Sequence, residues 1–167
     1  MCACEAFGVD AREVIPYLYT FKPLEHRLEP VGTYGGVTFV NDSISTIPQA
    51  AIAACQTLGK VDFLLLGGFD RDIDYTLLVD YVMEHPVPHL LFTGKAGERM
   101  MQLMKARGVV SNLVVYHTME EAFDYLISHT TPGDVCLLSP AASSYDQYKN
   151  FEERGTKFKR LAQAFGT

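Results

Sequence analysis

Mainly apolar runs, each followed by a helical pattern, are the feature of this sequence that most restricts its fold. Four runs stand out, at Val61–Leu66, His89–Phe92, Leu113–Tyr116 and Val135–Leu138. Strands that are apolar on both faces are typical of parallel sheets covered by helices on both sides. Because crossovers between parallel strands are right-handed, the alternation predicts an open, doubly wound, mostly parallel α/β sheet of Rossmann-like type.

The stretches after these runs have apolar residues at helical spacing. Helices are predicted over Tyr75–Met83, Ala96–Arg107 and Met119–Ser128, and a final amphipathic segment runs to Phe165. Thr118 and Glu121 form a capping box at the start of the third helix. The methionines of the second helix are expected in the core rather than in a cofactor site, since methionine fills irregular gaps between side chains.

The residues before Val61 predict a short helix, a β-hairpin and a second helix. In the first helix, over Asp10–Thr20, Asp10 would be the N-cap and Glu13 would stand in the capping-box position, while Pro16 must be accommodated or breaks the helix. The hairpin and the second helix are assigned as follows: strands Leu28–Val31 and Gly36–Val40, turn Tyr34–Gly36, and helix Ile47–Leu58.

Composition and charge exclude several classes of protein. A chain of 167 residues suits one domain, and its 48% hydrophobic and 20% charged residues are typical of a globular protein. A formal net charge of −6 argues against a nucleic-acid-binding surface, which needs a concentrated cationic field. No run approaches the ~18 apolar residues of a membrane span and no signal-peptide pattern opens the chain, so we expect a cytoplasmic protein without membrane insertion.

The cysteines and histidines show no metal-binding pattern. Cys2 and Cys4 form a CxC pair without zinc-site spacing, and Cys55 and Cys136 fall in apolar segments, so we expect free thiols in a reducing compartment. No metal site is predicted, because HExxH-type spacing is absent among the histidines, which are His26, His85, His89, His117 and His129.

Unusual polar sequence follows three of the predicted strands. Ligands of open parallel sheets bind beyond the carboxyl ends of the strands, so these segments are expected to meet at one edge and form a site. They are Asn41–Thr46, Gly67–Asp72 and Ser139–Ser144. Simpler explanations stay open: a helix N-cap for Asn41–Ser43, a sharp turn for Gly67–Gly68, and a capped loop for the third segment.

Arg71 is the candidate anion-binding side chain of this edge. A guanidinium after a glycine turn can hold a carboxylate or a phosphate through two parallel hydrogen bonds. The alternative is a solvated ion pair with Asp70, Asp72 or Asp74. The chain contains neither a GxxxxGK phosphate loop nor a GxSxG nucleophile motif. The sequence therefore predicts neither nucleotide binding by a phosphate loop nor a serine hydrolase.

Four motifs occur in a fixed order along the chain. They are His26–Glu29, Asn41–Ser43 with Thr46, Leu65–Gly68, and the run LSPAASSYDQYKNFEERG that starts at Leu138. In this order and at these spacings they resemble the C-terminal, glutamate ligase domain of the Mur ligases, and the resemblance covers nearly the whole chain. The last run is most similar to the members that add glutamate, and the DNPR-like motif of members that add diaminopimelate or lysine is absent.

The resemblance implies one part of a three-domain, ATP-dependent ligase. An N-terminal domain would hold a uridine nucleotide, and a central domain would carry the phosphate loop, a Mg²⁺ site and a carbamylated lysine. The reaction would add glutamate to UDP-N-acetylmuramoyl-L-alanine through an acyl phosphate, in peptidoglycan precursor synthesis. Residues 1–24 would be the end of the central ATPase domain with a linker, and residues 25–167 the amino-acid-binding domain.

The resemblance also assigns residues to the site. Those that match the surroundings of glutamate are Thr46, Arg71, Ser144 and Phe151, the last largely through its backbone. Those that match contacts to ATP are Arg27, for the phosphates, and Asp42, for the ribose. No catalytic residue and no metal ligand of such a ligase is assigned within this chain.

One position departs from the family pattern, which is Asp-Ser-Lys-x-Thr. Ile44 stands in place of its lysine. Arg71 occupies a second position that is often lysine, so the planar, forked guanidinium of arginine would bind the carboxylate there in place of the point charge of a lysine ammonium group. Two alternatives stay open. One is the same domain from another Mur ligase or a folylpolyglutamate synthase, and the other is a non-catalytic α/β binding module. A GxxxxGK loop encoded upstream of Cys2 would support a ligase, and a true start codon would support the module.

Overall fold

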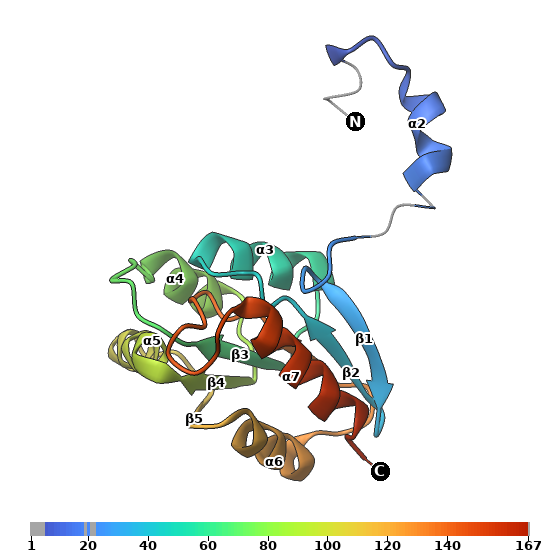
Figure 1. Ribbon diagram of the computed structural model, residues 1–167. Helices are drawn as coiled ribbons and strands as arrows, with labels where there is room; N and C mark the ends of the chain where they lie inside the picture. Colours follow the sequence, from blue (N-terminus) through green and yellow to red (C-terminus); the bar gives the residue numbers. More distant parts are fainter. Residues whose placement is uncertain (1–5, 19, 21–22, 167) are drawn as a thin grey trace.

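Six strands form one sheet in the order β1-β2-β6-β3-β4-β5, as Figure 1 shows for the computed structural model, which describes residues 6–18, 20 and 23–166. β1 runs antiparallel to β2, and every other neighbouring pair is parallel. This confirms the predicted α/β fold with its N-terminal hairpin. The strands are β1 (Glu29–Tyr34), β2 (Val37–Asn41), β3 (Phe63–Gly67), β4 (His89–Thr93), β5 (Asn112–Val115) and β6 (Val135–Leu138).

Helices cover both faces of the sheet, each face with its own hydrophobic layer. Successive side chains of a strand point to opposite faces, so Leu64 and Leu66 of β3 join one layer while Phe63 and Leu65 join the other. The first layer lies under α3 (Pro48–Leu58), α4 (Thr76–Glu84) and α5 (Gly94–Ala106). The second lies under α6 (Met119–His129) and α7 (Phe151–Gln163).

Side-chain packing within the two layers follows the sequence-based expectations. Met100 and Met104 of α5 are fully buried in the first layer, which confirms them as core residues. In the second layer, the Phe39 ring lies 5.7 Å from the ring of Phe123 and 6.1 Å from that of Phe158, measured between centroids. Such aromatic contacts stabilise the docking of α7 on the sheet, and the first turn of α7 is thereby held at the sheet edge.

The hairpin and the helix after it begin and end differently from the prediction. β1 continues to Tyr34, and the turn consists of Gly35 and Gly36 at φ +55° and +82°. Positive φ at both central residues matches the twist of the flanking strands and favours glycine. α3 begins at Pro48 with Ile47 as its N-cap and without a side-chain cap bond, so the explanation of Asn41–Ser43 as an N-cap is wrong.

Helix α2 (Ala11–Leu18) lies apart from the sheet in Figure 1. Asp10 Oδ1 accepts a hydrogen bond of 2.8 Å from the backbone N–H of Arg12, so Asp10 caps this helix, and Pro16 is accommodated inside it. The capping box of α6 is confirmed, because Thr118 Oγ1 accepts from the backbone N–H of Glu121 at 3.2 Å.

The two cysteines within the described part, Cys55 and Cys136, are free and buried, as expected. Burial raises the pKa of Cys55 to about 12, which keeps this thiol protonated. Cys2 and Cys4 lie outside the described residues. None of the helices in the described ranges has the length and apolar character that crossing a bilayer requires.

Candidate functional site

The three polar segments after β2, β3 and β6 meet at one edge of the sheet. Backbone hydrogen bonds join them: Asp42 N–H donates to Leu138 O at 2.8 Å, Gly67 N–H to Pro140 O at 2.8 Å, and Phe69 N–H to Ser143 O at 2.9 Å. The segment after β6 therefore lies between the other two, as the position of β6 between β2 and β3 requires.

Gly67 and Gly68 allow this close approach of backbones. Both have positive φ, +105° and +138°. A Cβ added to Gly67 would lie 2.0 Å from Thr93 O, and one added to Gly68 would lie 2.2 Å from Ser143 O. No side chain fits at either position. Gly67–Gly68 is therefore a sharp turn, as one explanation had it, and the lack of side chains in this turn lets the segment after β6 approach the end of β3.

A cavity of about 250 Å³ lies where these segments meet. It brings together the four residues that the sequence assigned to the surroundings of glutamate, together with the divergent position. Ser143 belongs to the predicted segment Ser139–Ser144, whereas sequence reasoning missed Tyr145, whose position directly after Ser144 was the available signal. The lining residues are Ile44, Thr46, Arg71, Ser143, Ser144, Tyr145 and Phe151.

Arg71 faces this cavity and not the neighbouring aspartates. Its Nη2 donates to the backbone oxygen of Thr46 at 2.7 Å. The described ion pairs of Asp70 and Asp72 are formed with Arg99 instead, at 3.1 and 2.8 Å, and Asp74 Oδ1 accepts from Thr76. The alternative prediction of an Arg71–aspartate ion pair is therefore wrong.

The two residues assigned to ATP lie close together in the structure but differ in their exposure to solvent. Arg27 is exposed, between His26 and Leu28, which both have positive φ. Asp42 is 2% exposed, and its two carboxylate oxygens accept from Leu28 N–H at 3.1 Å and from Ser139 Oγ at 2.6 Å. Asp42 thus holds the loop that presents Arg27, and its role toward a ribose stays a prediction.

A buried polar network behind this loop was not predicted. Asn41 Nδ2 lies 2.9 Å from both His26 Nδ1 and Glu29 Oε2. His26 is 3% exposed and approaches α7 so closely that a Cβ on Gly155 would lie 2.2 Å from its Nδ1. These contacts join the hairpin to α7, and Gly155 is small because the imidazole occupies the space of a side chain.

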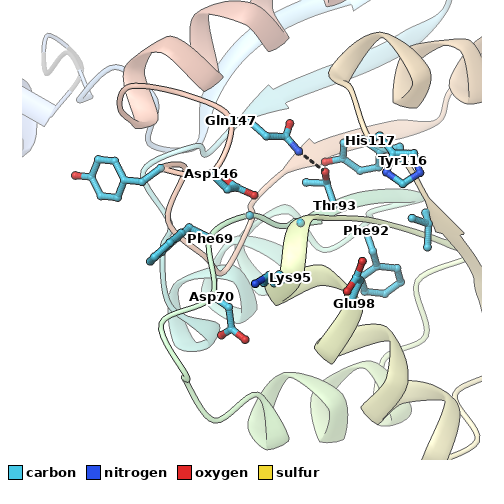
Figure 2. Close-up of a pocket in the computed structure, with 14 residues that line it drawn as sticks. Phe69, Asp70, Phe92, Thr93, Lys95, Glu98, Tyr116, His117, Asp146 and Gln147 are labelled. Carbon is cyan, nitrogen blue, oxygen red and sulfur yellow. Dashed lines mark hydrogen bonds between the residues drawn. The ribbon is translucent and has the colours of Figure 1, made fainter.

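A second, larger cavity of about 650 Å³ lies beyond the ends of β3, β4 and β5 (Figure 2). Two of its lining residues are joined by a hydrogen bond of 3.0 Å, which Gln147 Nε2 donates to Thr93 Oγ1 and which Figure 2 marks with a dashed line. Burial raises the pKa of Asp146 on its wall. Tyr145 lines both cavities. No residue assigned to glutamate lines this larger cavity, and within the described ranges no group of three or more His, Cys, Asp or Glu could hold a metal ion.

An open α/β sheet with a polar cavity at the carboxyl ends of its strands defines a ligand-binding domain of the doubly wound class. A family model of the Mur ligase glutamate ligase domain matches residues 26–142, which is well over half of the chain. The chain belongs to this family of glutamate ligase domains of Mur ligases.

Curated relatives extend this likeness to nearly the whole chain. It is 37% identical over 163 residues to the UDP-N-acetylmuramoylalanine--D-glutamate ligase of Desulfitobacterium hafniense, and 39% identical over 163 residues to that of Oleidesulfovibrio alaskensis. Both alignments cover 98% of this chain and 36% of the relative. The chain thus spans about a third of the length of these relatives.

Solved structures of other Mur ligases share the fold. The UDP-N-acetylmuramate-alanine ligase MurC of Thermotoga maritima superposes with a TM-score of 0.67 at 12% identity. The MurF ligase of Thermotoga maritima in complex with ADP superposes with a TM-score of 0.64 at 16% identity. In both cases the match covers 98% of this chain and 36% of the other.

Proposed function

We propose that this chain is the amino-acid-binding domain of a three-domain ligase that adds glutamate to UDP-N-acetylmuramoyl-L-alanine in peptidoglycan precursor synthesis. The observation that carries the proposal is the cavity at the sheet edge, whose lining includes Thr46, Arg71, Ser144 and Phe151. The names of the relatives support the substrate pair. In this proposal residues 1–24 belong to the central ATPase domain and its linker, residues 25–167 form the domain itself, and the ligase acts in the cytoplasm.

The cavity has the chemistry to hold an amino acid with two carboxylates. The Arg71 guanidinium uses one donor on Thr46 O and has others for a carboxylate. The hydroxyls of Thr46 and Ser144 add neutral donors, and the backbone N–H of Phe151 belongs to the first turn of α7, where such groups lack helical partners and favour anions. The apolar Ile44 side chain lowers the local polarity, which strengthens these charge contacts.

The proposed reaction consumes ATP, which the central domain would mainly bind, together with Mg²⁺. The γ-phosphate of ATP passes to the alanyl carboxylate of the nucleotide substrate, the glutamate amine attacks the resulting acyl phosphate, and inorganic phosphate leaves as the amide forms. Exposed Arg27 fits a contact to the ATP phosphates on domain closure. Asp42 would have to exchange one of its present hydrogen bonds to reach the ribose.

The test is an assay of ADP release by the complete polypeptide that carries this chain, with UDP-N-acetylmuramoyl-L-alanine and either D- or L-glutamate. We expect release that requires the nucleotide and one enantiomer of glutamate. Release driven by alanine or diaminopimelate instead, or release indifferent to any amino acid, would contradict the proposal. The 167-residue chain alone is the control: it should unfold cooperatively but release no ADP, because it contains no phosphate loop.

A further inference from the structure

Arg154, in the first turn of α7, is a cation enclosed by the domain. It is 2% exposed, and it is the one lysine or arginine that is buried among the described residues. A cation at this end of a helix is opposed by the helix dipole, and a charge removed from water costs free energy unless other groups compensate it. The position of Arg154 therefore requires an explanation in the groups around it.

The guanidinium of Arg154 joins the segments that form the smaller cavity. Nε donates to Ser43 Oγ at 3.0 Å, and Nη2 donates to Ser43 O at 2.8 Å and to Ala142 O at 3.1 Å. Ser43 Oγ in turn donates to Phe151 O at 2.8 Å. Each group held in this way is next to, or part of, a residue of the cavity lining: Ile44 follows Ser43, Ser143 follows Ala142, and Phe151 lines the cavity itself.

Arg154 forms no ion pair within the described part of the domain, although the Asp146 carboxylate is close enough to stabilise its charge electrostatically. The three acceptors of Arg154 are a hydroxyl and two carbonyl oxygens. Its Nη1 is buried without a hydrogen-bond partner and faces Gly68, where a Cβ would lie 3.2 Å away. Burial lowers the pKa of Arg154 to about 10, so the group keeps its charge at neutral pH.

We propose that Arg154 is a positioning residue of the glutamate cavity, which fixes Ser43, Ala142 and Phe151 and places a buried positive charge without an ion-pair partner behind the cavity wall. This inference rests on the proposed function, because it names glutamate as the anion. The charge lies in a low-dielectric interior, where its attraction for a dicarboxylate is screened less than at the surface. Arg71 would contact the ligand, and Arg154 would act through the wall that it holds.

The experiment compares Arg154→Gln and Arg154→Lys in the complete polypeptide, with KM measured for glutamate and for ATP. We expect Arg154→Gln to raise the glutamate KM at least 10-fold while the ATP KM stays within about twofold. Lysine keeps the charge but loses the fork, so Arg154→Lys should recover part of the loss. Arg160→Gln, an exposed position on the same helix, is the control and should change neither constant beyond about twofold.

A purely structural role of Arg154 would give a different result. It would lower the melting temperature and the active fraction, hence kcat, but would leave the glutamate KM of the folded fraction unchanged, and this would overturn the inference. If Arg154→Gln does not fold, Ser43→Ala tests the same link, since it removes the acceptor of Nε and the bond to Phe151 O. A smaller rise of the glutamate KM is expected, about 3- to 10-fold, and an unchanged KM would overturn the inference.

Failure of the proposed function is separately visible in the same assay. The unmodified polypeptide would then show no glutamate-dependent ADP release, whatever the variants do. Glutamate use by the unmodified polypeptide with equal KM values in Arg154→Gln would instead reject only the role of Arg154.

Discussion

The two cavities at the sheet edge differ in charge as well as in size. The smaller, of about 250 Å³, has a cation, Arg71, and no carboxylate on its lining. The larger, of about 650 Å³, has three carboxylates on its lining, from Asp70, Glu98 and Asp146, against one lysine, Lys95. This difference in lining charge favours the smaller cavity for a dicarboxylate. Volume alone would favour the larger cavity as the ligand site, whereas charge favours the smaller one for the proposed substrate.

The wall between the two cavities includes the backbone at Phe69, which lines the larger cavity, and at Ser143, which lines the smaller one. An isolated β-bridge pairs Phe69 with Ser143, and Gly68 has no side chain that could thicken the wall. Tyr145 contributes to both linings. Substitutions in the wall should therefore affect both cavities, whereas substitutions on one lining should affect only that cavity.

Gly67→Ala should have the largest effect, because it disrupts the edge that both cavities share. The new Cβ would lie 2.0 Å from Thr93 O, at a φ of +105° that L-residues rarely adopt. We expect a loss of at least ~3 kcal/mol in the free energy of unfolding, measured by urea titration. Gly133→Ala is the matched control, with positive φ but nothing within 4 Å of its Cβ, and should cost less. Equal losses would contradict the close approach described for Gly67.

Arg71→Ala and Lys95→Ala test the contrast in charge directly. Loss of a charged hydrogen bond to a carboxylate costs about 1.5–3 kcal/mol, so Arg71→Ala should weaken glutamate use about 10- to 150-fold. Lys95→Ala, on the larger cavity, should leave the glutamate KM within about twofold. Steady-state kinetics on the complete polypeptide measures both. An unchanged glutamate KM with a raised ATP KM in Arg71→Ala would assign Arg71 to the nucleotide.

Ile44→Lys tests whether the smaller cavity has room for a second cation. Beside Arg71 the new charge should help little, because like charges repel each other, but it should partly rescue Arg71→Ala. A double-mutant cycle on kcat/KM for glutamate should show about 0.5–3 kcal/mol of interaction, as is usual for residues in contact. Strict additivity would mean that Ile44 and Arg71 do not act on the same carboxylate.

Asp146→Asn should have the smallest effect and tests the acidic character of the larger cavity. Burial raises the pKa of Asp146, so the folded state binds this proton more tightly than the unfolded chain. Stability is therefore lost as the pH rises above the ordinary aspartate value of ~3.9. The side chain is partly solvated, so Asp146→Asn should gain only a few tenths of a kcal/mol at pH 7, and nothing at low pH. Thermal unfolding against pH checks this, with Asp124→Asn as control.

Most of the fold could be predicted because hydrophobic periodicity is a local signal. The runs that became β3, β4 and β6 are apolar on both faces, and their order with the helices limits the topology. The start of α7 was not predicted, although Asn150 and Glu153 carry the same capping pattern as Thr118 and Glu121, and Asn150 Oδ1 does accept from Glu153 N–H at 2.9 Å.

The meeting of the strand ends could also be predicted, whereas their side-chain partners could not. Handed crossovers place the carboxyl ends of parallel strands at one edge, whatever the loops contain. The bond between Arg154 and Ser43 joins residues 111 positions apart and depends on how two loops pack. The larger cavity depends in the same way on the loop after β6, where no sequence pattern marked Asp146 and Gln147 as its wall.

The place of β6 in the sheet has a consequence for how the domain is made. The ribosome completes this strand last of the six, yet it pairs with β2 on one side and β3 on the other. Until Val135–Leu138 emerges, the nascent chain holds two partial sheets whose facing edges are unpaired and open to pairing with other chains. A chain that stops before β6 therefore cannot form a smaller, continuous version of this sheet. The contact between Ser43 and Arg154 forms only after nearly all of the domain has been translated.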